Sequence, residues 1–178
     1  DDLLKSFNSK DITKLSSGID SIDKCFNGGF KDGSVTTILG IDGDIGKNIW
    51  SLNSIYNSIS NDKNVLVIFP DESEDVLYQR LILRHSYDSR FENELVCDED
   101  GNYDENIVNN VCLDFYDSLS KHLIVMGEDE FDISTVTSLQ RLFVVAEHQF
   151  NERFESGIDL VIIDNFNNMK LNDGKKND

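Results

Sequence analysis

Short apolar runs alternate with segments of helical periodicity along this chain of 178 residues. The runs are rich in β-branched residues and have the length of strands. They are SVTTILG (34–40), VLVIF (65–69), HLIVM (122–126) and IDLVIID (158–164). A strand that is apolar throughout is usually covered on both faces, as in parallel sheets. The alternation therefore predicts an α/β fold with a mostly parallel sheet, flanked by helices and joined by right-handed crossovers.

Apolar residues at helical spacing separate these runs and predict the helices. The predicted helices cover 17–26 with Ser17 as cap, 47–59, 73–86, and 134–154 with Ser134 as cap. The domain organisation follows from the same reading. Its segments are a polar lead-in (1–14), one core (15–170) that contains an acidic insertion or mobile loop (87–110), and a polar tail (171–178).

The charge, the cysteine content and the length of the apolar runs argue against several classes of protein. The formal net charge of −18 argues against strong nucleic-acid binding by this stretch, because such binding needs a basic face. Three widely spaced cysteines, Cys25, Cys97 and Cys112, predict neither a disulfide framework nor a zinc site and fit a reducing cytoplasm. The N-terminal residues do not resemble a signal peptide, and no apolar run approaches the roughly 20 residues of a membrane helix. We expect a cytoplasmic protein without a membrane partner.

The segment GIDGDIGKN (40–48) lies between the first predicted strand and the next helix. A strand, a glycine-containing turn and a helix N-terminus together form an anion site, because backbone N–H groups and the helix dipole converge there. Gly43 and Gly46 allow close approach to oxygen atoms, and Lys47 can reach terminal phosphates. The predicted phosphate-binding residues are Asp42, Gly43, Asp44, Ile45, Gly46, Lys47 and Asn48. The alternative is an ordinary glycine turn.

Acidic residues follow two of the other predicted strands. Asp164 ends an apolar strand, where an aspartate can hold magnesium beside a phosphate loop. Glu72 follows the strand 65–69 and can polarise an attacking water, with Asp71 and Glu74 as lesser candidates. The alternatives are a capping aspartate and a polar turn.

These segments, in this order, resemble the C-terminal RecA-like ATPase domain of replicative DNA helicases of the DnaB type, including phage relatives. The resemblance covers roughly residues 12–85 and 120–170. The segments that carry it are LSSGIDSIDKCFNGGFKDGSVTTILG (15–40), GIDGDIGKN (40–48), VLVIFPDESEDVLYQRLI (65–82) and LVIIDNFNNM (160–169). It implies a RecA-like P-loop NTPase core, of which this chain resembles a part that is incomplete at the C-terminal end.

The resemblance also implies a function: ATP-driven DNA unwinding in a full protein that is a homo-hexamer. The implied catalytic residues are Lys47, Glu72 and Asp164, with ATP and Mg²⁺ as cofactors and Asn48 and Asp164 as metal ligands. Single-stranded DNA would bind through later regions, and a neighbouring subunit's arginine would complete hydrolysis. Two positions depart from the pattern: Ile41 replaces the first motif glycine, and Asn48 replaces the magnesium-binding serine or threonine.

Other readings remain open. A recombination or regulatory ATPase of the RecA, RadA and KaiC kind shares the Gly-Gly segment. A degenerate nucleotide-binding scaffold without turnover is favoured by Asn48. A small-molecule kinase with the same loop would need an arginine-rich lid, whereas 87–110 is acidic.

Overall fold

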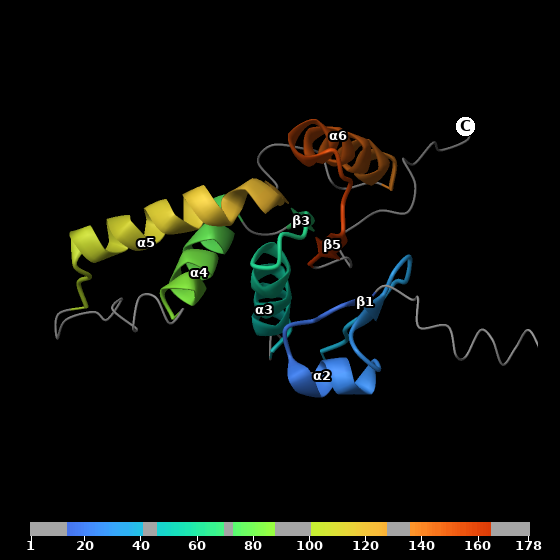
Figure 1. Cartoon of the computed structure of the whole chain (residues 1–178), viewed down its shortest axis with the longest axis horizontal. Coiled ribbons are helices and arrows are strands. Elements are labelled where there is room, and N and C mark those ends of the chain that lie inside the picture. The colour runs from blue at the N-terminus through green and yellow to red at the C-terminus, as the bar shows by residue number, and fades with distance from the viewer. Residues whose placement is uncertain (1–13, 41–45, 70–72, 88–100, 128–135, 165–178) are drawn as a thin grey trace, which may run out of the picture. The chain divides into compact units, whose positions relative to one another are not determined.

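The computed structural model describes residues 14–40, 46–69, 73–87, 101–127 and 136–164. The chain divides into two compact units, Asp1–Ser58 and Ile59–Asp178. In chain order the elements are β1 (Lys14–Leu15), α2 (Asp20–Cys25), β2 (Phe30–Lys31), α3 (Lys47–Ile59), β3 (Val65–Ile68), α4 (Glu74–Ser86), α5 (Glu105–Ser118), the 3₁₀ turn η1 (Ser120–His122), β4 (Leu123–Met126), α6 (Val136–Phe154) and β5 (Leu160–Ile163) (Figure 1).

The second unit is built on a parallel sheet with the strand order β4-β3-β5. Val65 of β3 is in register with Leu123 of β4 and with Leu160 of β5. All four residues of β3 are fully buried, as a strand between two neighbours and two covered faces must be. The α/β fold class and these three predicted strands are therefore confirmed, and the architecture is consistent with part of a RecA-like ATPase.

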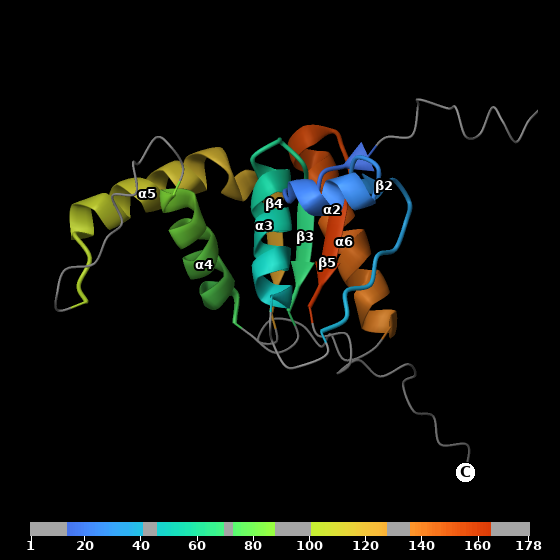
Figure 2. The same cartoon turned by 90° about the horizontal axis from the view of Figure 1, so that it is seen from below.

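Helix α6 covers one face of this sheet (Figure 2). Leu139, Leu142, Ala146 and Phe150 recur at helical spacing along α6 and form one buried cluster with side chains of β3 and β4. The strand residues of this cluster are Leu66, Ile68, Ile124 and Met126. The periodicity that predicted the helix is thus the periodicity of its buried face.

Helices α4 and α5 pack against each other (Figures 1 and 2). Tyr78 of α4 meets Phe115 of α5 edge to face, with ring centroids 6.4 Å apart. His85, which is fully buried, places Nε2 2.8 Å from an Asp114 carboxylate oxygen. Helix α5 was not predicted, because its first turns fall in the range 87–110 that was expected to be an insertion or mobile loop. Asp104 begins it by accepting hydrogen bonds from the N–H groups of the following turn.

The first unit contains the antiparallel pair β1–β2 and the helices α2 and α3. The prediction of a strand over 34–40 is wrong for this structure: these residues form no regular element, and Val35 is 94% and Leu39 85% exposed. β-Branched residues favour extended backbone, but a strand also needs a neighbour that pairs its N–H and C=O groups. Neither sheet among the described residues includes this segment.

The predicted cap at Ser17 is also wrong. Helix α2 begins at Asp20 with Ile19 in the cap position, and no side chain caps it. The Ser17 hydroxyl instead donates to the Asp23 carboxylate. Ser134 lies outside the described residues. No helix in the described part of the chain combines the length and the apolar character that a membrane crossing requires.

A polar network joins the starting ends of the three parallel strands. The Asn64 carbonyl accepts hydrogen bonds from the N–H groups of Asp159 and Leu160, at 2.9 and 3.2 Å. The Asn64 side-chain Nδ2 donates to the Gly157 carbonyl at 2.9 Å. Its Oδ1 lies 3.0 Å from His122 Nδ1. Because Nδ2 is fixed as the donor to a carbonyl, Oδ1 is an acceptor, and His122 therefore carries its hydrogen on Nδ1.

Two opposing effects act on the protonation of His122: burial of the ring, and the Asp62 carboxylate, whose Oδ1 lies 3.3 Å from Nε2. His122 is 6% exposed, and its ring stacks on Phe154 with centroids 4.6 Å apart. Burial lowers the pKa of His122; Asp62 and Asp159 act in the opposite direction without cancelling this effect, and Lys121 adds to it. The folded protein consequently takes up a proton at this ring less readily than the unfolded chain does.

This difference predicts a pH-dependent stability. The contribution of His122 is fully present above its unfolded pKa of about 6.5 and is lost progressively as pH falls toward the lower folded pKa. A His122→Gln variant cannot titrate there, so its free energy of unfolding in urea should change less between about pH 7.5 and about pH 5 than that of the wild type. His148→Gln, at a 69% exposed side chain, is the matched control and should follow the wild type. Equal pH dependence of wild type and His122→Gln would contradict the prediction.

Candidate functional site

Gly46, Lys47 and Asn48 stand at the start of α3. Gly46 has a φ of +84°, a left-handed conformation that glycine adopts without strain, and its carbonyl accepts the Trp50 N–H at 2.9 Å. Lys47 and Asn48 are the first two residues of the helix, and both are half-buried. The chain thus changes direction at Gly46 and enters the helix with the lysine in its first position.

The start of α3 is electrostatically suited to an anion. The first N–H groups of an α-helix have no partner within the helix, and the aligned peptide dipoles add a partial positive charge there. No acidic residue occupies the first turn of α3, so no side chain of that turn offsets this charge. The ammonium group of Lys47 adds a full positive charge at the same end of the helix.

Other residues of the first unit hold α3 in place. The rings of Trp50 and Phe30 meet edge to face with centroids 5.6 Å apart. The Ser54 hydroxyl donates to the Ser17 carbonyl at 2.8 Å, across 37 residues of sequence. The sequence analysis did not identify these positioning contacts. Gly18 in the segment SSG (16–18) is a signal for a turn. No periodicity in the sequence, however, indicates which backbone carbonyl a serine of a distant helix will contact.

Asp164 lies in the second unit, at the carboxyl edge of the parallel sheet. It directly follows β5 and is half-buried, and its N–H donates to the Ile68 carbonyl at 3.1 Å. At the same edge, the Phe69 N–H donates to the Met126 carbonyl at 3.0 Å. The end of β5 is therefore directly beside the end of β3, and Glu74 begins α4 a few residues further along the chain. Ligands of parallel α/β sheets bind at this edge.

The remaining predicted site residues lie outside the described part of the chain. They are Asp42, Gly43, Asp44 and Ile45 of the glycine-containing loop and Glu72 with its neighbour Asp71. The structure therefore places Gly46, Lys47 and Asn48 together in the first unit and Asp164 in the second, and the roles assigned to all of them stay predictions.

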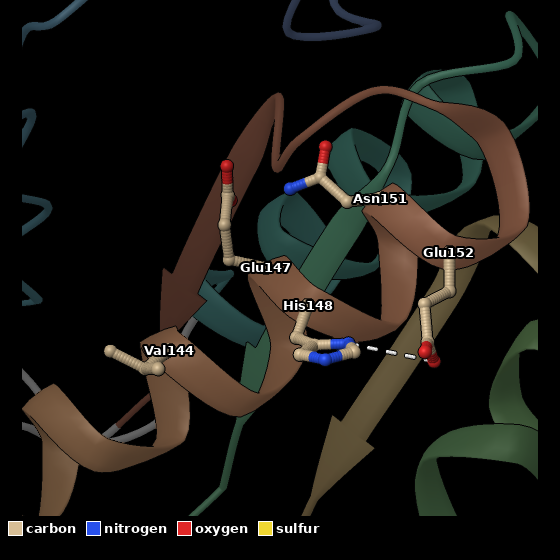
Figure 3. Close-up of a pocket in the computed structure, with 5 residues that line it drawn as sticks. All are labelled: Val144, Glu147, His148, Asn151 and Glu152. Atoms are coloured by element: carbon tan, nitrogen blue, oxygen red, sulfur yellow. Dashed lines mark ion pairs between the residues drawn. The ribbon is translucent and has the colours of Figure 1, made fainter.

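A surface hollow of about 440 Å³ lies elsewhere, along one exposed side of α6 (Figure 3). Its lining residues are Val144, Glu147, His148, Asn151 and Glu152, and all of them belong to α6. His148 Nδ1 and a Glu152 carboxylate oxygen are 3.5 Å apart, and both side chains are about 70% exposed. Glu147 accepts the Ile158 N–H at 3.0 Å. None of these residues belongs to the predicted nucleotide site, and the hollow is the solvated side of a surface helix.

Comparison with protein families bears directly on the start of α3. Residues 15–88 match the family model for the KaiC ATPase. This family is of the RecA-like P-loop kind, so RecA-like character is supported for this part of the chain, whereas the finer DnaB assignment is not. No match was found among curated proteins.

The matched range contains most of the predicted nucleotide-site residues. It includes the whole glycine-containing segment 40–48, α3 with Lys47 and Asn48, β3, and Glu72 further along the sequence. It stops before Asp164. The match supports P-loop, ATP-binding character for residues 15–88 of the chain.

Asn48 supplies a test of metal use. A threonine at this position would offer the hydroxyl group that binds Mg²⁺ in phosphate loops. We expect Asn48→Thr to increase the gain in ATP affinity that Mg²⁺ produces, relative to the gain in the wild type, in titrations with Mg²⁺ or with EDTA. Asn53→Thr, on the same helix, is the matched control for the cost of a β-branched residue. An identical Mg²⁺ dependence in Asn48→Thr and Asn53→Thr would contradict the expected gain from a hydroxyl group at residue 48.

Proposed function

We propose that this chain is the ATP-binding part of a RecA-like ATPase, and that in the full protein this ATPase is the motor of a DnaB-type replicative DNA helicase. The observation that carries the first statement is the family match over 15–88, with Gly46 and Lys47 placed at the positive end of α3. The DnaB-type statement rests on the resemblance of the sequence segments around 15–48, 65–82 and 160–169.

The phosphates of ATP would bind at the start of α3. The amides of Gly46, Lys47 and Asn48 would donate to phosphate oxygens, together with the loop residues from Asp42 to Ile45. The Lys47 ammonium group would pair with the terminal phosphates. Each charge-assisted hydrogen bond of this kind contributes roughly 1.5–3 kcal/mol, so the lysine is the residue on which affinity depends most.

The proposed magnesium ligands are Asn48, at the start of α3, and Asp164, after β5, and the residue proposed to hold the attacking water is Glu72. The Asn48 amide carbonyl and the Asp164 carboxylate are oxygen donors, the type that Mg²⁺ prefers, so this donor set fits the ion. Mg²⁺ bound there supplies charge neutralisation for the transferred phosphoryl group. Glu72 would orient the attacking water as a general base.

Full activity would require more than this chain. An arginine from a neighbouring subunit of a homo-hexamer would stabilise the transition state, and single-stranded DNA would bind through other regions of the protein. The net charge of −18 argues against strong DNA binding by this stretch itself.

A second candidate is an ATPase of recombination or regulation, of the KaiC kind. The matched family model favours it directly. Both candidates use the same phosphate loop and differ in what ATP hydrolysis drives. Unwinding of a forked DNA duplex by the full-length protein, dependent on ATP, would select the helicase. ATP hydrolysis without unwinding would select the second candidate.

Calorimetric titration with ATP and Mg²⁺ tests the shared part of the proposal. Wild-type protein should show saturable binding, and Lys47→Ala should bind at least about tenfold more weakly, because it loses one charge-assisted interaction with the phosphates. Lys24→Ala, at an exposed lysine of α2, removes the same charge and should bind as the wild type does. Equal affinity of Lys47→Ala and Lys24→Ala would contradict phosphate binding at the start of α3.

A further inference from the structure

The Asp23 carboxylate organises a short turn that precedes α2. Its Oδ1 accepts hydrogen bonds from the Ser17 N–H at 2.8 Å and the Ser17 hydroxyl at 2.6 Å. Its Oδ2 accepts the Ser16 hydroxyl at 2.6 Å. The Ser16 oxygen in turn accepts the Gly18 N–H at 3.1 Å. One carboxylate therefore fixes the backbone and both hydroxyl groups of Ser16 and Ser17.

These hydrogen bonds depend on the negative charge. Partial burial raises the pKa of Asp23, but the hydrogen bonds from Ser16 and Ser17 outweigh burial and leave the pKa lowered. The carboxylate is consequently ionised throughout the neutral range, and the turn is held by charge-assisted bonds, which are stronger than neutral ones.

The opposite side of this turn contacts α3. The Ser17 carbonyl accepts the Ser54 hydroxyl at 2.8 Å, and Ser17 itself is fully buried. The Ser16 carbonyl accepts Asn57 Nδ2 at 3.2 Å. Gly18 has a φ of +78°, and a Cβ there would lie 2.7 Å from the Asn57 Cβ, so only glycine allows this approach. The turn is thus fastened to the last turns of α3.

A second contact holds α3 near its start. Phe30, in β2, meets Trp50 edge to face, and β2 pairs with β1 through Leu15↔Phe30. Leu15 is directly followed by Ser16, so both contacts belong to one continuous stretch of backbone. Two contacts at different heights determine the direction of a helix axis, whereas one would leave it free to tilt.

We propose that Asp23 is a positioning residue for the nucleotide site: by fixing Ser16 and Ser17 against Ser54 and Asn57, it orients α3 and hence the helix start that carries Lys47. The inference rests on the proposed nucleotide binding. Asp23 touches no reacting atom in this account. It acts through α3, in the way that the orientation of a supporting element determines where a binding group stands.

Trp50 provides a direct readout because it is the single tryptophan of the chain and lies one helical turn from Lys47. The experiment compares Asp23→Ala, Asp23→Asn and Ser54→Ala with the wild type, using the full chain. It measures the Trp50 emission spectrum, the ATP affinity in the presence of Mg²⁺, and far-UV circular dichroism. Asp20→Ala is the matched control, since it removes an exposed aspartate from the same helix.

The expected result is a graded loss. Asp23→Ala removes every hydrogen bond to the turn. Asp23→Asn keeps an oxygen for Ser17, so its effect should be smaller. Ser54→Ala removes one neutral hydrogen bond, worth about 0.5–1.5 kcal/mol, and should weaken ATP binding by about two- to tenfold. In all three variants the Trp50 emission should move to longer wavelength in the absence of nucleotide, as its contact with Phe30 loosens. Asp20→Ala should match the wild type in both measurements.

The outcomes separate this inference from the proposed function. Failure of the wild type to bind ATP would overturn the nucleotide site and this inference together. Wild-type ATP binding with unchanged affinity and Trp50 emission in Asp23→Asn and Ser54→Ala would overturn the positioning role alone. If Asp23→Ala does not fold, the milder pair decides. A loss of helix content in proportion to the loss of affinity would show a purely structural role and contradict the proposal.

Discussion

Strand β3 carries two ladders of backbone hydrogen bonds, to β4 on one side and to β5 on the other, and the second unit depends on this double pairing. Its four residues are fully buried, so a helix must cover the sheet, and α6 does so with a periodic apolar face. The strand registers also determine which residues lie side by side at the two ends of the strands. Asn64 joins β3 to the start of β5, whereas the Asp164 N–H bonds to Ile68 at the opposite edge. A carboxylate placed after β5 is thereby brought beside the end of β3.

The parts of the fold that the sequence predicted are those that depend on local pattern. Apolar runs predicted β3, β4 and β5, because strands covered on both faces are apolar throughout. The helical spacing of Leu139, Leu142 and Ala146 predicted the buried face of α6. The segment 34–40 has the composition of a strand but no described partner, and pairing is a property of neighbours and not of the segment. Contacts across long separations, such as Ser17 with Ser54, have no periodic signature and could not be predicted.

The candidate site shows the same division. The apolar spacing from residue 47 onward predicted that Lys47 begins α3, whereas the strand expected before the loop, 34–40, does not form. The family match over 15–88 supports the P-loop character of that segment. What the sequence did not indicate is how α3 itself is held. The hydrogen bonds of Asp23 and the Phe30–Trp50 contact connect residues 15–30 with α3, which gives the serine–glycine segment a physical role in holding that helix.

The central claim is that ATP binds at the start of α3. The most direct measurement is a titration of isotope-labelled protein with ATP and Mg²⁺, followed by the backbone amide chemical shifts. The account predicts the largest shifts at Gly46, Lys47 and Asn48, because their N–H groups would donate to the phosphates. The amides around His148, on the exposed side of α6, should stay unchanged. Saturable shifts around His148 with none at Gly46 to Asn48 would contradict the account.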